Sequence, residues 1–126
     1  MGDQLLLGNH GWIREAKNPV LPPGEAGTFD CGCCMNPWVL RVGDEYHLYY
    51  AGADAEGFRR ICKATAPMAD PTHWRRLGPI FDVGAPGSFD ARWNVLPHVV
   101  HMGGDRWHCY YTANSGVGEG LSAFPG

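Results

Sequence analysis

The fold is decided by residues 36–52, which read NPWVLRVGDEYHLYYAG. Aromatic and β-branched side chains lie on both sides of Gly43-Asp44, a dipeptide typical of tight turns between strands. The stretch therefore predicts two antiparallel strands, over 36–42 and 45–52, joined by that turn.

The same pattern returns 60 residues later, in residues 96–114, which read LPHVVHMGGDRWHCYYTAN. One additional glycine, Gly104, shifts the frame by one position within the second copy. A period of this length indicates a repeat architecture built from supersecondary units. The identical pairs are Pro19/Pro79, Gly24/Gly84, Gly27/Gly87, Phe29/Phe89, Asp30/Asp90, Pro37/Pro97, Val39/Val99, Gly43/Gly103, Asp44/Asp105, His47/His108, Tyr49/Tyr110 and Tyr50/Tyr111.

Short strands and turns make up each unit. Further strands are predicted over 58–65 and 73–77 in the first unit, and over 95–102 and 106–112 in the second. Four consecutive antiparallel strands in about 60 residues are the form of a β-propeller blade. A jelly roll or sandwich is the structural alternative, but neither predicts a 60-residue self-match. We therefore predict an all-β protein containing part of a β-propeller.

The repeat also divides the chain. We predict one incomplete propeller domain over 1–126, with the last strand of a preceding blade at 12–16, a complete blade at 29–77 and half of the next blade at 89–126. Repeat units that bury their faces against neighbours usually need three or more copies. We therefore expect these 126 residues to be part of a longer chain.

Charge and hydropathy exclude several classes of protein. The net charge of −3 argues against a nucleic-acid binder held by phosphate contacts, and no apolar run approaches the length of a membrane span. The first residues lack the charged and then apolar layout of a signal peptide, which predicts a cytoplasmic protein. The basic residues Arg59, Arg60, Lys63, Arg75 and Arg76 read as a solvated strand face.

Five cysteines are present, so at least one has no partner within the chain. Cys31, Cys33 and Cys34 are crowded, but their spacing is poor for structural zinc, which favours two to four residues between paired cysteines. We predict reduced thiols, with no metal site and no cofactor.

A family resemblance rests on the run Phe29-Asp30-x₅-Asn36-Pro37-Trp38-Val39-x₃-Gly43-x₂-Tyr46-x-Leu48-Tyr49-Tyr50-x-Gly52. It resembles the first blade of five-bladed propeller glycosidases of the glycoside hydrolase family 43 and family 32 type. The segments 61–65 and 73–80 look like their recurring third and fourth strands. The likeness covers about residues 12–114. It implies an N-terminal fragment of a five-bladed β-propeller glycoside hydrolase, with an oligosaccharide as ligand.

Topology sorts the acidic candidates for chemistry. In an up-and-down blade, the loop entering the first strand and the loop joining strands two and three lie on one face. This places Asp30, Asp54, Glu56, Asp90 and Glu119 at the predicted pocket mouth. Asp30 is the candidate catalytic carboxylate. The alternative is that Asp30 and Asp90, which are repeat equivalents, both cap turns.

A binding site should break the symmetry of the repeat, because only one copy is wanted in the pocket. Residues 31–36 read CGCCMN, whereas 91–96 read ARWNVL, and Trp38 becomes His98. Stacking and hydrogen-bonding side chains of this kind suit a sugar subsite, although packing between blades is the alternative role. The predicted substrate-binding residues are Asn36, Trp38, Asp90, Arg92, Trp93, Asn94 and His98.

The chain departs from the family at one decisive position. Hydrolysis of a glycoside normally takes two carboxylates. In family 43 type enzymes the base is an aspartate directly before the proline that opens the first-blade strand, and here Asn36 precedes Pro37. Since an amide cannot take a proton from water, three interpretations stay open: a glycoside hydrolase, a non-catalytic carbohydrate-binding propeller, and a protein-interaction scaffold.

Overall fold

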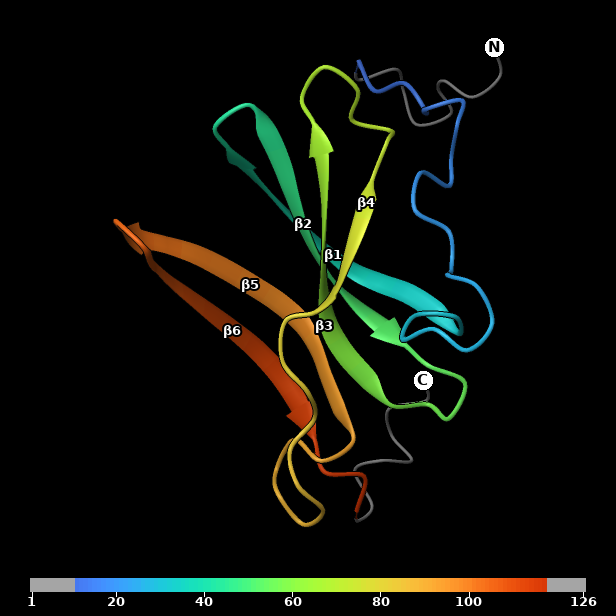
Figure 1. Ribbon diagram of the computed structural model, residues 1–126, viewed down its shortest axis with the longest axis vertical. Coiled ribbons are helices and arrows are strands. Elements are labelled where there is room, and N and C mark those ends of the chain that lie inside the picture. Colours follow the sequence, from blue (N-terminus) through green and yellow to red (C-terminus); the bar gives the residue numbers. More distant parts are fainter. Residues whose placement is uncertain (1–10, 118–126) are drawn as a thin grey trace.

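The computed structural model describes residues 11–117, which contain six β-strands and no helix. Figure 1 shows their arrangement. The prediction of an all-β protein is confirmed, and the six strands predicted between residues 36 and 112 are present with bounds shifted by a few residues. The strands are β1 (Cys33–Val42), β2 (Glu45–Ala53), β3 (Arg59–Pro67), β4 (Arg75–Pro79), β5 (Trp93–Gly103) and β6 (Arg106–Asn114).

The first unit is an antiparallel meander in which β1 pairs with β2, β2 with β3, and β3 with β4. Val42 pairs with Glu45, so Gly43-Asp44 forms the predicted two-residue turn. Gly43 has a φ of +63°, which a glycine adopts without steric cost.

The second unit reproduces the first in detail. Trp38 pairs with Tyr49 across β1 and β2, and His98 pairs with Tyr110 across β5 and β6. Both first strands carry a bulge just before this pair, and the residue in each bulge, Asn36 or Leu96, has a φ of +55°. The sequence repeat is therefore also a repeat of backbone conformation.

Side chains alternate between the two faces of the first sheet, as the pleat of a strand requires. One face carries a cluster of Leu48, Tyr50, Cys62 and Ala64, covered by partly buried residues that include Leu21 and Trp74. The opposite face carries Tyr49 and Ile61, which pack with Val99 of β5. The second cluster lies between the two units.

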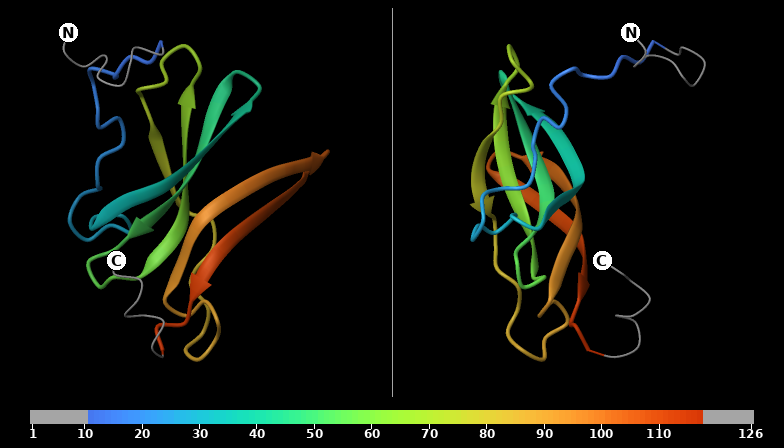
Figure 2. Two further views of the ribbon diagram at one scale, coloured as in Figure 1. Left: turned by 180° about the vertical axis from the view of Figure 1, so that it is seen from behind. Right: turned by 90° about the vertical axis from the view of Figure 1, so that its right-hand side faces the viewer.

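The two units are in contact from the first residues of β3 and β5 onward. β3 and β5 form one parallel pair, Arg59 with Trp93, which makes a six-stranded mixed sheet. From there the β5–β6 hairpin diverges from β1–β4 (Figure 2). Trp38 bridges the gap, because its Nε1 donates to the carbonyl oxygen of Val99 at 3.0 Å.

One predicted strand does not form. Residues 12–16 have no strand conformation, and Trp12 is 84% exposed. A β-strand needs a partner to satisfy its backbone donors and acceptors. This segment has no ladder partner within residues 11–117, so the strand predicted there as the last of a preceding blade is wrong.

The packing between the units predicts that replacing two isoleucines by alanine lowers the free energy of unfolding by different amounts. We expect Ile61→Ala, which empties a fully buried position, to lower the free energy of unfolding by about 2–5 kcal/mol. Ile80→Ala is the matched control, since Ile80 is 40% exposed and its change should cost below about 1 kcal/mol. Urea denaturation followed by tryptophan fluorescence measures both, and equal costs would contradict the packing described.

Candidate functional site

The candidate site lies at the end of the sheet where β1 and β5 begin. The pairs Cys33–Ala53, Ala53–Arg59, Arg59–Trp93 and Trp93–Asn114 place these residues side by side across five strands. The loops before β1 and β5 and the loop between β2 and β3 gather at this end, opposite the hairpin turns (Figure 1). The loops that carry Asp30, Asp54, Glu56 and Asp90 therefore lie at one end of the sheet, as the strand order predicted. Glu119 lies outside the described residues.

Asp30 is fully buried at this end and is surrounded by donors. Its Oδ2 accepts from the Tyr50 hydroxyl at 2.9 Å and from Arg76 Nε at 2.9 Å. Its Oδ1 accepts from the Thr28 hydroxyl at 3.3 Å. Its backbone carbonyl accepts from Gly24 N, which closes the preceding loop. The carboxylate is thus bonded to the protein on both oxygens and has no surface open to a ligand.

The neighbours of Asp30 keep their protons. Burial, and next the hydrogen bond to Asp30, raise the pKa of Tyr50 well above its ordinary value, so Tyr50 stays a donor. Burial, and next the negative charge of Asp30, raise the pKa of the Cys34 thiol to about 11. Cys34 therefore remains a neutral thiol, and its Sγ lies 3.6 Å from Asp30 Oδ2.

Asp90 occupies the equivalent place with fewer partners. It accepts from the Ser88 hydroxyl at 3.0 Å and from the Tyr111 hydroxyl at 3.3 Å. Its carbonyl accepts from Gly84 N, as that of Asp30 does from Gly24. Asp90 is only half-buried and has no arginine partner among residues 11–117. The same turn is therefore built twice, once with an ion pair and once without.

Of the predicted site residues, Arg92 and Trp93 contact the first unit, while Asn94 contacts the segment that leads into the second unit. The Arg92 guanidinium lies 4.3 Å from the centre of the Phe58 ring and donates to the carbonyl oxygen of Glu56. Trp93 is buried, and the Arg59 guanidinium lies 4.3 Å from the centre of its indole ring. Asn94 is fully buried and its Nδ2 donates to the carbonyl oxygen of Asp82 at 3.5 Å.

The remaining three predicted residues come together near the bulges. The rings of Trp38 and His98 are 4.0 Å apart between centroids, although the residues lie in different units. Asn36 is half-buried in the β1 bulge, two residues before Trp38, and His98 is exposed on β5. Burial divides the predicted set differently from sequence: Trp93 and Asn94 are buried and His98 is exposed. The other four, Asn36, Trp38, Asp90 and Arg92, are half-buried, and Trp38 also packs into the cluster between the units.

An ion-pair network at the same end was missed by the sequence analysis. Arg60 Nη1 lies 2.9 Å from Asp54 Oδ2, and Arg60 Nε lies 2.7 Å from Asp82 Oδ1. Asp54 Oδ1 also accepts from the backbone amides of Glu56 and Phe58, both at 3.0 Å. Arg60 therefore ties the β2–β3 loop to the segment that leads into the second unit. Arg76 pairs with Asp30, Arg59 lies over the Trp93 ring and Lys63 lies over the Tyr49 ring. With Arg60, four of the five basic residues that were read as a solvated face therefore have a partner.

All five cysteines are free thiols, and Cys62 is buried. Across residues 11–117, no group of histidine, cysteine, aspartate and glutamate side chains is placed to hold a metal ion. The same residues include no helix long and apolar enough to cross a membrane.

No protein-family model matches the chain, and no curated protein matches it in sequence.

The two aspartate turns allow a matched test of the Asp30 cluster. Tyr50→Phe removes a buried donor to Asp30, and we expect it to lower the free energy of unfolding by about 1–2 kcal/mol. Tyr111→Phe removes the longer and more exposed bond to Asp90, and it should cost below about 1 kcal/mol. Urea denaturation of both variants is the measurement, and a larger loss in Tyr111→Phe would contradict the assignment.

The Asp54 network predicts a pH dependence. Burial raises the pKa of Asp54, but the Arg60 hydrogen bond and the two backbone amides outweigh it and lower that pKa below its ordinary value of 3.8. The unfolded chain then binds the proton first, so this stability is present above the ordinary pKa and is lost as pH falls through the folded pKa. Asp54→Asn should therefore flatten the fall in unfolding free energy between about pH 5 and pH 3.

Thermal denaturation across that pH range measures the effect. Asp44→Asn, at the exposed β1–β2 turn, controls for the loss of one negative charge. Equal flattening in the two variants would contradict a specific role for the Arg60 pair.

Proposed function

We propose that the chain forms neighbouring blades of a glycosidase-like five-bladed β-propeller that binds oligosaccharide, and that the binding residues are Asn36, Trp38 and His98. The observation that carries this proposal is the meeting of Trp38 and His98, each of which directly follows the bulge of its strand, in two equivalent strands. The binding of sugar is favoured over its hydrolysis at Asp30.

The propeller proposal is supported by how the two units meet. The first unit is a four-stranded antiparallel meander, as a blade is. Its first strand approaches the first strand of the second unit, through Trp38 and Val99. Propeller blades place their first strands around a common centre, so the strand starts of β1 and β5 would line it.

Sugar binding is supported by the chemistry of Asn36, Trp38 and His98. Aromatic faces stack on the apolar side of a pyranose, while amide and imidazole groups bond its hydroxyls. Trp38 and His98 supply the rings, and Asn36 supplies the amide beside them. Trp93, in contrast, has Arg59 over its ring and is buried, which favours the packing role weighed for it above.

Binding without hydrolysis is supported by the state of the carboxylates. Glycosidases need one carboxyl group as acid and a second as base or nucleophile, both reaching the substrate. Asp30 is fully buried and bonded to Tyr50 and Arg76. An amide, Asn36, stands where the family places its base.

The protein offers a matched pair of tryptophan–histidine stacks for the test. Trp38 and His98 lie at the proposed site, whereas Trp107 and His101, whose rings are 4.2 Å apart, lie beside the β5–β6 turn at the opposite end. We expect Trp38→Ala and His98→Ala to weaken oligosaccharide binding about tenfold or more, because each removes a stacking face. Trp107→Ala and His101→Ala should leave the affinity unchanged.

Isothermal titration with a panel of plant and microbial oligosaccharides measures binding, and chromatography of the same mixtures measures release of shorter sugars. Circular dichroism confirms that each variant is folded. Absence of binding by the wild-type chain, or equal losses from both stacks, would overturn the site. Release of shorter sugars by the wild type would replace binding with hydrolysis.

A further inference from the structure

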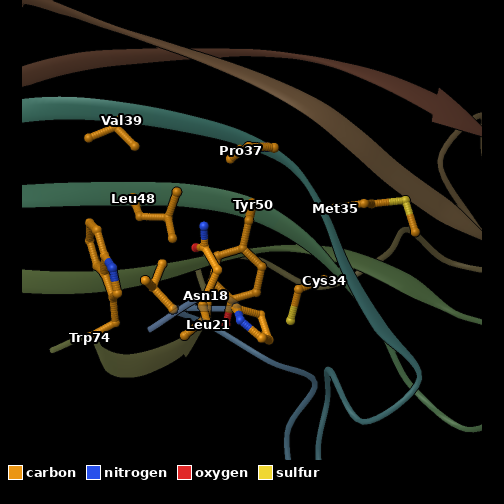
Figure 3. A pocket seen from close by; sticks show the side chains of 11 residues that line it. Asn18, Leu21, Cys34, Met35, Pro37, Val39, Leu48, Tyr50 and Trp74 are labelled. Carbon is orange, nitrogen blue, oxygen red and sulfur yellow. The ribbon is translucent and has the colours of Figure 1, made fainter. Parts of the chain in front are cut away.

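An apolar hollow lies on the face of the first sheet that points away from the second unit. Its volume is about 330 Å³, and Figure 3 shows Val39 and Pro37 on β1 beside Leu48 and Tyr50 on β2. Trp74 and Leu21 line its other side. We call the residues Leu21, Val39, Leu48 and Tyr50 the acceptor face. Val39 is 49% exposed there, beside the exposed Pro37.

The repeat shows what a surface of this kind packs against. The equivalents of the acceptor face in the second unit are Phe81, Val99, Cys109 and Tyr111. All four pack into the cluster between the units, together with Tyr49 and Ile61 of the first sheet. Val99 is 3% exposed, whereas its equivalent Val39 is 49% exposed. Leu48 and Tyr50 are buried by their own unit, through Leu21 and Trp74, so the part of this surface that stays uncovered within residues 11–117 is Val39.

The covering surface is also present twice. In the first unit, Leu40 and Tyr49 cover the second unit, and Tyr49 is 8% exposed. Their equivalents, Val100 and Tyr110, are 36% and 61% exposed, beside Met102 at 47%. We call Val100, Met102 and Tyr110 the donor face. Within residues 11–117, Val39 of the acceptor face and all three donor-face residues are thus exposed, although their equivalents belong to a contact that the two units already make.

We propose that a second copy of this chain docks head-to-tail, with the donor face of one copy covering the acceptor face of the next. The contact would repeat the packing of Tyr49 and Leu40 on Val99, with Tyr110 and Val100 of one copy on Val39 of the other. Its two sides are different surfaces, so the interface is heterologous and leads to a closed ring or an open chain of copies. This inference does not depend on the proposed binding of sugar.

Three valines allow a matched test on the full chain. Val39→Asp places a charge in the acceptor face, and Val100→Asp places one in the donor face. Val117→Asp, at a residue that is 75% exposed and belongs to neither face, is the control. Burying an unpaired carboxylate opposes association, so each face variant should need a concentration about tenfold or more higher to associate.

Sedimentation velocity over a concentration series measures the association. The wild type and Val117→Asp should both gain mass as concentration rises. A mixture of Val39→Asp and Val100→Asp tests the direction of docking, because the first keeps an intact donor face and the second an intact acceptor face. That mixture should form a dimer of one copy of each variant.

Circular dichroism verifies that the variants are folded. A wild-type chain that stays monomeric at every concentration, as it would if the contact were made only between units of one polypeptide, would overturn the proposal. So would association that Val39→Asp and Val100→Asp leave unchanged, or a mixture of the two that stays monomeric.

Discussion

A buried carboxylate organises the first unit. Asp30 joins three separate parts of the chain: the loop before β1, strand β2 through Tyr50, and edge strand β4 through Arg76. A buried ion pair of this kind contributes little net stability, but removing one partner leaves an uncompensated charge and costs several kcal/mol. The geometry of the entry loop and the position of β4 therefore depend on the same two oxygen atoms.

The second constraint is the period of the strands. Tyr49 and Tyr50 are neighbours in sequence but point to opposite faces of β2, into two different clusters. One strand therefore packs on both sides, against residues of its own unit on one face and against the second unit on the other. The second unit repeats this alternation of side chains. The residues that form the contact between the units therefore have repeat equivalents, such as Val39 and Tyr110, that are exposed.

The functional assignment changes once the side chains are placed. Among the sequence candidates Trp93 has the largest aromatic face, yet Arg59 covers it and the neighbouring strands bury it. Trp38 and His98 occupy equivalent positions of the repeat and their rings meet across the units, with His98 exposed and Trp38 half-buried. This comparison of burial bears on ligand binding, because a ligand can stack only on a ring face that the protein leaves uncovered.

The sequence by itself determined the strands, the Gly43-Asp44 turn and the repeat, because pleat alternation and turn chemistry are local properties. It also placed Asp30 and Asp90 in equivalent turns. Only the tertiary structure decided that Arg76 reaches Asp30 from 46 residues away and that residues 12–16 form no strand. Both depend on which residues, distant in sequence, the fold brings into contact, and a local sequence pattern does not predict such contacts. The partners of each side chain in the candidate site are therefore set by the tertiary structure.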